Sequence, residues 1–270
     1  MKILHFRSSK VFVIAILLTV GAFATVAYAN HSWGSYHWAR TANPFTLKLG
    51  DNITTAWDAY LVTASTDWNA STVLDTTIVA GGTNATRGKK TPKTCVPTSG
   101  RVEVCNYKYG ANGWLGIASI WASGNHIVQG TVKLNDTYFN TSTYNKPAWR
   151  NLVMCQEVAH TFGLDHQDEI FTNPNLDTCM DYTNSPESNQ HPNAHDFEEL
   201  ELIYAHLDWT TTLSQSTSSL PGLALGQDED FTNANSWGTA IRYSSDGKPS
   251  LFIRNLGNGQ QLITHVFWAK

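Results

Sequence analysis

Basic side chains are scarce in this sequence. Its 270 residues include 18 lysines and arginines against 22 aspartates and glutamates, which gives a net charge of −4. Beyond residue 29 the only basic cluster is a short Arg-Gly-Lys-Lys stretch at residues 87–90, which we interpret as a solvated loop. Proteins that bind nucleic acid need basic surfaces to neutralise phosphates. The composition therefore argues against a nucleic-acid partner.

Long apolar runs are also missing beyond residue 29, so no later segment is expected to span a bilayer. At the N-terminus, three basic residues precede a nearly unbroken apolar run at 11–20 and an Ala-Tyr-Ala tripeptide at 27–29. This order is typical of a secretory signal peptide. We expect residues 1–29 to be removed, which leaves a secreted chain that begins at Asn30 and does not associate with membranes. The alternative is an uncleaved anchor, for which the apolar run is barely long enough.

Cysteine is rare as well, with four residues in the whole chain. No two of them form a Cys-x-x-Cys pair, which argues against a cysteine-ligated metal site. An even number of cysteines in an exported chain favours disulfides instead. Three pairings are open among the four residues, which are Cys95, Cys105, Cys155 and Cys179.

The most informative stretch reads CQEVAHTFGLDHQD. Residues four apart on a helix share one face, so Gln156 and His160 can point at a common atom. Glu157 lies about 100° further round the helix, where it can act on a metal-bound water without binding the metal. Gly163 can adopt the left-handed conformation that ends a helix, and the chain can then turn back so that His166 reaches the same point. Three ligands around an open fourth position are the pattern of a catalytic zinc site.

The spacing of these residues resembles the elongated zinc-binding motif of the metzincin metalloproteases, His-Glu-x-x-His-x-x-Gly-x-x-His. Gln156 stands in place of the first histidine. The resemblance implies zinc bound by Gln156, His160 and His166, and a matrixin-like protein is the nearest description. A glutamine oxygen is a harder and weaker donor to zinc than imidazole, so it would loosen the ion and leave it more electrophilic.

A second match lies downstream, in Thr-Cys-Met-Asp-Tyr at residues 178–182. It resembles the metzincin Met-turn, which implies that Met180 lies beneath the metal and that Tyr182 is a further catalytic residue, as in astacin-like and serralysin-like members. The resemblance extends over about residues 36–208, and it is specific only at the two motifs. The alternative is an amphipathic helix with two unrelated histidines and a buried methionine.

The resemblance also favours one disulfide pairing. Cys155 precedes the first ligand position and Cys179 precedes the Met-turn methionine, so a Cys155–Cys179 bond would tie the two motifs together. The remaining bond, Cys95–Cys105, would join a loop to a strand. No cysteine lies between residue 29 and Cys95, so the cysteine-switch propeptide of secreted matrixins has no counterpart here.

The hydrophobic pattern predicts an α+β fold with a twisted, mixed and mostly parallel sheet, because strand, helix and strand follow one another with short connections. The active-site helix is expected to begin at Pro147, and a C-terminal helix follows with Asp196 as its N-cap. The resemblance implies that residues 114–121 are the edge strand that pairs with a bound peptide. Alternating polarity predicts strands at residues 45–49, 72–79, 101–107, 114–122 and 126–134, and helical spacing predicts a helix at residues 54–68.

Three regions are expected after the signal peptide. Residues 30–209 form the metzincin-like catalytic domain, residues 210–226 a Ser/Thr-rich linker, and residues 227–270 a small β-rich extension. The extension has three alternating stretches separated by turn residues, which predict a three-stranded meander. A meander of this size is marginal on its own, so we expect it to pack on the catalytic domain.

Three further histidines are weaker candidates. His126 begins a predicted strand, where a core or surface role is more usual than a ligand role. His191 and His195 flank Pro192, which disrupts helical geometry, so we interpret them as solvated loop residues rather than a second metal site.

Two functions follow from these observations. The first is a secreted, monomeric zinc endopeptidase that hydrolyses protein or peptide substrates through metal-activated water, with Glu157 as the general base. The second is a binding module on a metzincin scaffold, with weak or no metal and no turnover. The retained Glu157 favours the enzyme, because a binding module has no use for a general base. Structural calcium has no support in the sequence.

Overall fold

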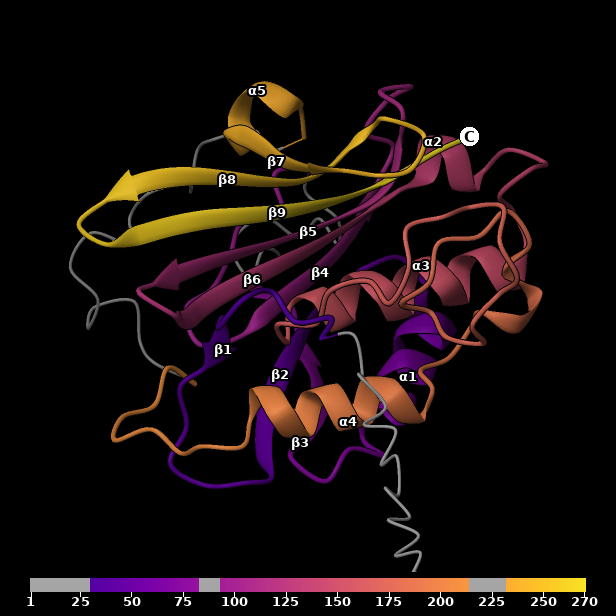
Figure 1. Ribbon diagram of the computed structural model, residues 1–270. Helices are drawn as coiled ribbons and strands as arrows, with labels where there is room; N and C mark the ends of the chain where they lie inside the picture. Colours follow the sequence, from indigo (N-terminus) through magenta and orange to yellow (C-terminus); the bar gives the residue numbers. More distant parts are fainter. Residues whose placement is uncertain (1–29, 83–92, 214–231) are drawn as a thin grey trace, which may run out of the picture.

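The computed structural model describes residues 30–82, 93–213 and 232–270, and the fold is built around one mixed sheet (Figure 1). The described residues give this sheet nine strands in the order β3-β2-β4-β6-β5-β9-β8-β7, with the short β1 paired to β6. The strands are β1 (His37–Trp38), β2 (Phe45–Asn52), β3 (Leu74–Ala80), β4 (Val102–Tyr107), β5 (Trp114–Ser123), β6 (His126–Asn135), β7 (Thr239–Tyr243), β8 (Pro249–Gly257) and β9 (Gln260–Trp268).

The two halves of the sheet differ in strand direction. β2, β3, β4 and β6 are parallel neighbours, and β5 runs antiparallel to β6. β7, β8 and β9 are antiparallel throughout. The expected α+β class with a mixed sheet is confirmed, and the parallel pairs lie in its N-terminal half.

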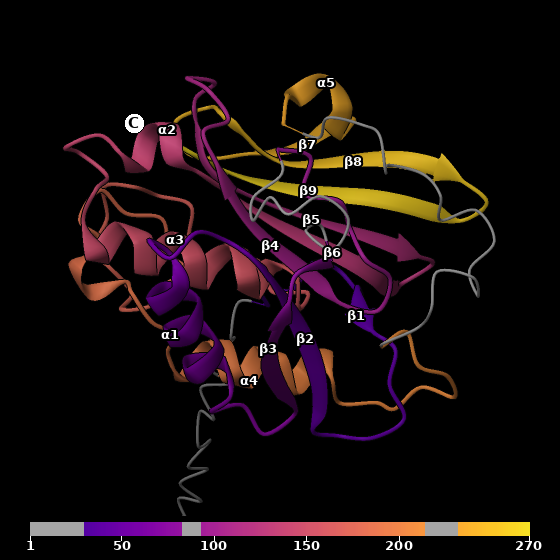
Figure 2. The same cartoon turned by 180° about the vertical axis from the view of Figure 1, so that it is seen from behind.

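The long helices α1, α3 and α4 lie on one side of the sheet, as Figures 1 and 2 show from opposite directions. Proline at the first position of α3 confirms the predicted start of that helix. None of the helices in the described part of the chain is long and apolar enough to cross a membrane. The helices are α1 (Asp58–Trp68), α2 (Asp136–Phe139), α3 (Pro147–His160), the 3-10 helix η2 (Pro186–Ser188), α4 (Ala194–Ile203) and α5 (Ala234–Trp237).

The start of α4 differs from the sequence prediction. Asn193, not Asp196, is the N-cap, and its side chain accepts hydrogen bonds from the first turn. The Asp196 side chain accepts a hydrogen bond from the backbone N–H of Asn193, which completes a capping box. The prediction was wrong because asparagine caps a helix as well as aspartate does, and the third helical position is the usual place for the acidic partner.

The C-terminal meander forms as predicted, but it continues the sheet instead of packing on it. β9 pairs antiparallel with β5 along its whole length, from Trp114 opposite Trp268 to Ser123 opposite Gln260. The prediction that residues 114–121 form a free edge strand is therefore wrong. The physical reason is that an open strand edge and a marginal three-stranded meander each lack partners, and pairing them satisfies both. The predicted linker and signal peptide lie largely outside the described residues.

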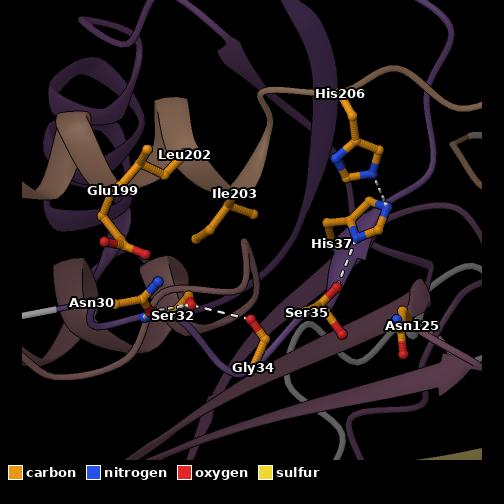
Figure 3. Close-up of a pocket in the computed structure, with 10 residues that line it drawn as sticks. All are labelled: Asn30, Ser32, Gly34, Ser35, His37, Asn125, Glu199, Leu202, Ile203 and His206. Carbon is orange, nitrogen blue, oxygen red and sulfur yellow. Dashed lines mark hydrogen bonds between the residues drawn. The ribbon is translucent and has the colours of Figure 1, made fainter.

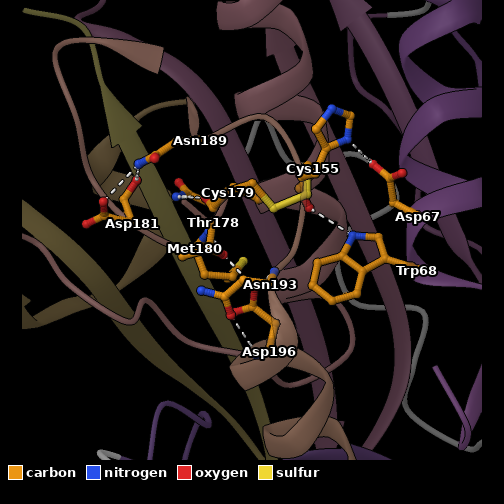
Figure 4. Close-up of a disulfide and its surroundings, with 12 residues drawn as sticks. Asp67, Trp68, Cys155, Thr178, Cys179, Met180, Asp181, Asn189, Asn193 and Asp196 are labelled. Atoms are coloured by element: carbon orange, nitrogen blue, oxygen red, sulfur yellow. Dashed lines mark hydrogen bonds and ion pairs between the residues drawn. A yellow bond between two sulfur atoms is a disulfide. The ribbon is translucent and has the colours of Figure 1, made fainter. Parts of the chain in front are cut away.

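Two disulfides are present, and they join the predicted partners. Cys95 is bonded to Cys105, and Cys155 on α3 is bonded to Cys179. Figure 4 shows the second bond beside Met180, between α3 and the segment that leads to α4. Disulfides of this kind are consistent with an exported chain.

Candidate metal centre

The turn after α3 brings the two motif histidines together. His160 is the last residue of the helix. Gly163 then adopts a φ of +99°, and a Cβ there would lie 2.4 Å from the carbonyl oxygen of Tyr36. Only glycine meets both demands, for a left-handed conformation and for this close approach. The chain reverses, and the Nε2 atoms of His160 and His166 come to lie 3.0 Å apart.

Hydrogen bonds at the far side of each ring orient these two imidazoles. His160 Nδ1 lies 2.8 Å from the carbonyl oxygen of Leu164, and His166 Nδ1 lies 2.8 Å from Oε1 of Glu169. A carbonyl and an ionised carboxylate only accept, so each Nδ1 carries the hydrogen and each Nε2 presents its lone pair. Burial lowers the pKa of His160 well below its usual value, which keeps that ring neutral. This is the arrangement found around metal-ligating histidines.

Glu169 is held ionised in this arrangement. Burial alone would raise the pKa of its carboxyl group, but the hydrogen bond from His166 and the charge of Arg242 outweigh it. The net effect is a pKa below the usual value, so Glu169 remains an acceptor for the imidazole.

A third histidine, His265, joins the pair from β9. It lies opposite Ala118 of β5, and its ring stacks on that of His160 with centroids 3.9 Å apart. A ring nitrogen of each of the three histidines lies within 4.8 Å of the others. His265 Nδ1 is buried with no hydrogen-bond partner among the described residues. Sequence reasoning missed His265 because it has no spacing relation to the motif, and only the pairing of β9 with β5 brings it here.

Gln156 is fully buried, and its amide is partly engaged. Nε2 donates to the carbonyl oxygen of Cys179 at 2.6 Å. Oε1 is buried without a hydrogen-bond partner in the described chain, so its lone pairs stay unused. A buried amide oxygen without a partner is costly, and a metal ion would relieve that cost. Its role as a ligand remains a prediction.

The Glu157 side chain packs against β5 at Gly116. A Cβ at Gly116 would lie 2.5 Å from Oε1 of Glu157, so this strand position has room only for glycine. Burial raises the pKa of Glu157 well above its usual value, and the backbone N–H of Ala118 opposes the shift without cancelling it. A carboxyl group with a raised pKa holds a proton more readily than an ordinary carboxylate, which suits a general base.

Tyr182 lies beside His166, and Met180 lies two residues earlier in the chain. Met180 is fully buried, and its carbonyl oxygen accepts the backbone N–H of Gln167 at 2.7 Å. The Tyr182 ring lies 4.3 Å from that of His166, centroid to centroid. Its hydroxyl donates to the carbonyl oxygen of Val266 on β9 at 3.4 Å. The side chain predicted to be catalytic is therefore bonded to the C-terminal strand.

Residues of the meander and of the N-terminal segment cover the candidate metal centre. Arg242 of β7 pairs with Asp165 and, at 3.5 Å, with Glu169. Trp33 stacks on His265 with centroids 4.3 Å apart and donates its indole N–H to that ring. Exposed fractions are 0% for Glu157 and 1% for His265. In this conformation a peptide cannot lie on β5.

The donor set fits zinc. Neutral imidazoles with oriented Nε2 atoms are preferred zinc ligands, and an amide oxygen can complete the coordination. The unpartnered Oε1 of Gln156 is a candidate further donor. Nε2 of His265 accepts the indole N–H of Trp33, so the His265 ring would join the set only if that hydrogen bond opens.

Comparisons with known proteins give little. No protein-family model matches the sequence, and no curated protein matches it. Among solved structures, the chain is similar to high choriolytic enzyme 1, a hatching enzyme zinc-protease from Oryzias latipes (medaka fish), with a TM-score of 0.35 and 10% sequence identity over 63% of this chain and 95% of that chain. A likeness at this level assigns neither an activity nor a family.

Proposed function

We propose that this chain is a secreted zinc-dependent endopeptidase held in a closed form by its own C-terminal meander. The observation that carries the proposal is the approach of His160 and His166, whose Nε2 atoms lie 3.0 Å apart with both rings oriented by acceptors at Nδ1. Glu157, at the adjacent helical position, supplies a buried carboxyl group with a raised pKa. A bound zinc ion would polarise a peptide carbonyl and acidify a water molecule.

The side chains then have distinct roles. His160 and His166 would hold the metal, with Gln156 Oε1 as a further donor. His265 belongs to β9, so it could join them only in the closed form. The Glu157 carboxylate takes a proton from water and passes it to the leaving amine nitrogen of the substrate. Tyr182, once its hydroxyl leaves the carbonyl oxygen of Val266, is free to donate to the carbonyl oxygen of the substrate.

A substrate peptide is expected to bind where β9 now lies. β5 offers its backbone groups to β9 in antiparallel register, and strand addition to a sheet edge is a common way to bind an extended peptide. β9 thus holds the position that a substrate would take. Turnover on this sheet edge requires β9 to separate from β5.

The second candidate function is a metal-binding protein without turnover. It is favoured by the burial of Glu157 and His265, at 0% and 1% exposure, beneath a fully paired strand. In that case the meander would be a permanent part of the sheet.

An assay on a nicked chain separates the two. A protease site placed within residues 210–226 allows the zinc-loaded chain to be cut, and size-exclusion chromatography reports whether the C-terminal fragment leaves. We expect cleavage of a broad peptide library by the chain that has lost the fragment, and little by the intact chain. Glu157→Gln in the same nicked background should keep zinc and lose ~10²–10⁴-fold in activity.

Two outcomes decide against parts of the proposal. Cleavage that survives Glu157→Gln would rule out the proposed general base. A zinc-loaded chain that sheds the fragment and still cleaves no peptide would leave the metal-binding protein as the function.

A further inference from the structure

A second group of histidines lies outside the candidate metal centre, where β1 meets the segment that follows α4. We call it the surface histidine cluster, and it consists of His37, His126, His206 and Asp208. Figure 3 shows His37 and His206 with their rings together at the edge of a cavity of about 300 Å³. The members come from three segments that are distant in sequence.

The distances between the donor atoms match those around a metal ion. His37 Nε2 and His206 Nε2 lie 3.2 Å apart. Oδ1 of Asp208 lies 3.4 Å from the first and 3.7 Å from the second. Ligands at about 2.0–2.2 Å from a tetrahedral zinc ion are themselves about 3.3–3.6 Å apart. All three separations are therefore close to the edges of such a tetrahedron.

His37 is oriented as a ligand would be. Its Nδ1 lies 2.7 Å from the carbonyl oxygen of Ser35, which only accepts, so Nδ1 carries the hydrogen. Nε2 then presents its lone pair to the cluster. Burial lowers the pKa of His37, and the hydrogen bonds to Ser35 and Asp208 offset this only in part, so the neutral ring is favoured. A backbone carbonyl behind a histidine is a usual outer partner of a metal ligand.

Asp208 is held in place through its other oxygen. Oδ2 accepts the backbone N–H of Arg40 at 3.2 Å and its guanidinium Nη1 at 3.0 Å. Arg40 is itself 1% exposed and is fixed by a bond from Nη2 to the carbonyl oxygen of Tyr204 at 2.7 Å. These bonds leave Oδ1 directed at the imidazoles.

We propose that His37, His206 and Asp208 form a second zinc site, at the surface of the protein. His126 Nε2 lies 3.2 Å from the same oxygen of Asp208 but is not one of the three converging donors. The His206 side chain is 56% exposed, so an ion reaches the site from solvent without any opening of the fold. Two imidazoles and one carboxylate suit zinc better than calcium or magnesium, which prefer oxygen ligands throughout.

The site would join β1 to the end of α4. Because its ligands converge only in the folded chain, zinc bound here stabilises the native state by mass action. Of the two histidines predicted as solvated loop residues, His191 lies in a loop and pairs with Asp67. The prediction was wrong for His195, which is the second residue of α4, 22% exposed at its side chain, and 3.7 Å from Glu198. The inference does not depend on the proposed peptidase activity.

The test uses the full chain, stripped of metal by a chelator and titrated with Zn²⁺ by calorimetry, with Co²⁺ absorption as a second reading of tetrahedral coordination. His206→Ala removes one exposed ligand, and Asp208→Ala removes the carboxylate ligand. We expect each variant to bind one equivalent fewer than the wild type, or to bind it about 100-fold more weakly or worse, since even the loss of an outer partner of a ligand costs up to that factor.

His191→Ala is the matched control, because His191 is also 56% exposed at its side chain and belongs to neither cluster. It should titrate as the wild type does. Zinc should also raise the melting temperature of the wild type and the control by more than that of either variant. If both variants bind zinc as the wild type does, the cluster is a histidine–carboxylate hydrogen-bond network only, and the proposal fails. The comparison with wild type holds whether or not the candidate metal centre binds an ion.

Discussion

The two histidine clusters of this protein contain the same kinds of side chains in opposite surroundings. In the candidate metal centre, His160, His166 and His265 are 1%, 8% and 1% exposed. In the surface histidine cluster, the side chain of His206 is 56% exposed. Both have oriented rings, so orientation alone does not distinguish them. Burial does: the first cluster is enclosed by a strand that must move before any substrate enters, and the second is open to solvent as it stands.

The largest effect on the contrast between the two clusters is expected when His265 is removed from the buried one. If His265 is a zinc ligand, His265→Gln should weaken zinc binding at that centre by about 100-fold, as the loss of a ligand must cost at least what the loss of an outer partner costs. Zinc titration of the full chain measures this. The matched change is Thr264→Ser, which keeps the β9 pairing and should leave affinity unchanged. Equal affinity in His265→Gln and wild type would mean that His265 only covers the centre.

The tight packing around Glu157 can be tested by substituting Gly116. Gly116→Ala would place a Cβ 2.5 Å from Oε1 of Glu157 and 2.7 Å from Cγ1 of Val153. Overpacking of this kind costs about 1–3 kcal/mol in the free energy of unfolding, which urea denaturation can measure.

Gly130→Ala on neighbouring β6 is its control, because the nearest atom there is a side-chain carbon at 3.3 Å. We expect its cost to be smaller. Equal costs at the two glycines would show that the packing around Glu157 is no tighter than elsewhere in the sheet.

The smallest effect concerns pH. Burial lowers the pKa of His265 well below its usual value, so in metal-free protein the unfolded chain takes up a proton near pH 6.5 that the folded chain does not. Stability contributed by the neutral ring is therefore present above about pH 6.5 and falls as pH drops below it. Glu157, with its raised pKa, acts in the opposite direction.

The contribution of His265 is obtained by comparing the pH dependence of stability in the wild type with that in a variant that lacks this histidine. Urea titrations of wild type and His265→Gln, with chelator present, should show a shallower loss of stability below about pH 6.5 in the variant. Parallel curves for the two proteins would indicate that His265 is solvated in solution and titrates normally.

Much of the core of the centre could be read from residue spacing. The positions of Gln156, His160, Gly163 and His166 are a local property of one helix and its turn, and the turn forms as the spacing requires. The same holds for Pro147 at the start of α3. The Cys155–Cys179 bond was predicted from the resemblance, because that places both cysteines beside elements that must meet.

What the spacing could not give is long-range pairing. Residues 114–121 were recognised as a strand with free backbone groups, and residues 227–270 as a meander without sufficient core. Nothing in either stretch specifies the other as its partner, so periodicity does not predict that the two pair. His265 and the surface histidine cluster were missed for the same reason: their members meet only through the packing of distant segments.

The pairing of β9 with β5 also sets an order of events. β9 comes after every other strand of the sheet in sequence, yet it lies between β5 and β8 in the middle of it. Joining β5 to β9 closes a loop of more than a hundred residues, and such contacts form late because their loop-closure entropy is paid before the contact is gained. His160 and His166 belong to a short local turn and can meet much earlier. During folding, a metal ion can therefore reach this pair before His265 arrives to enclose it.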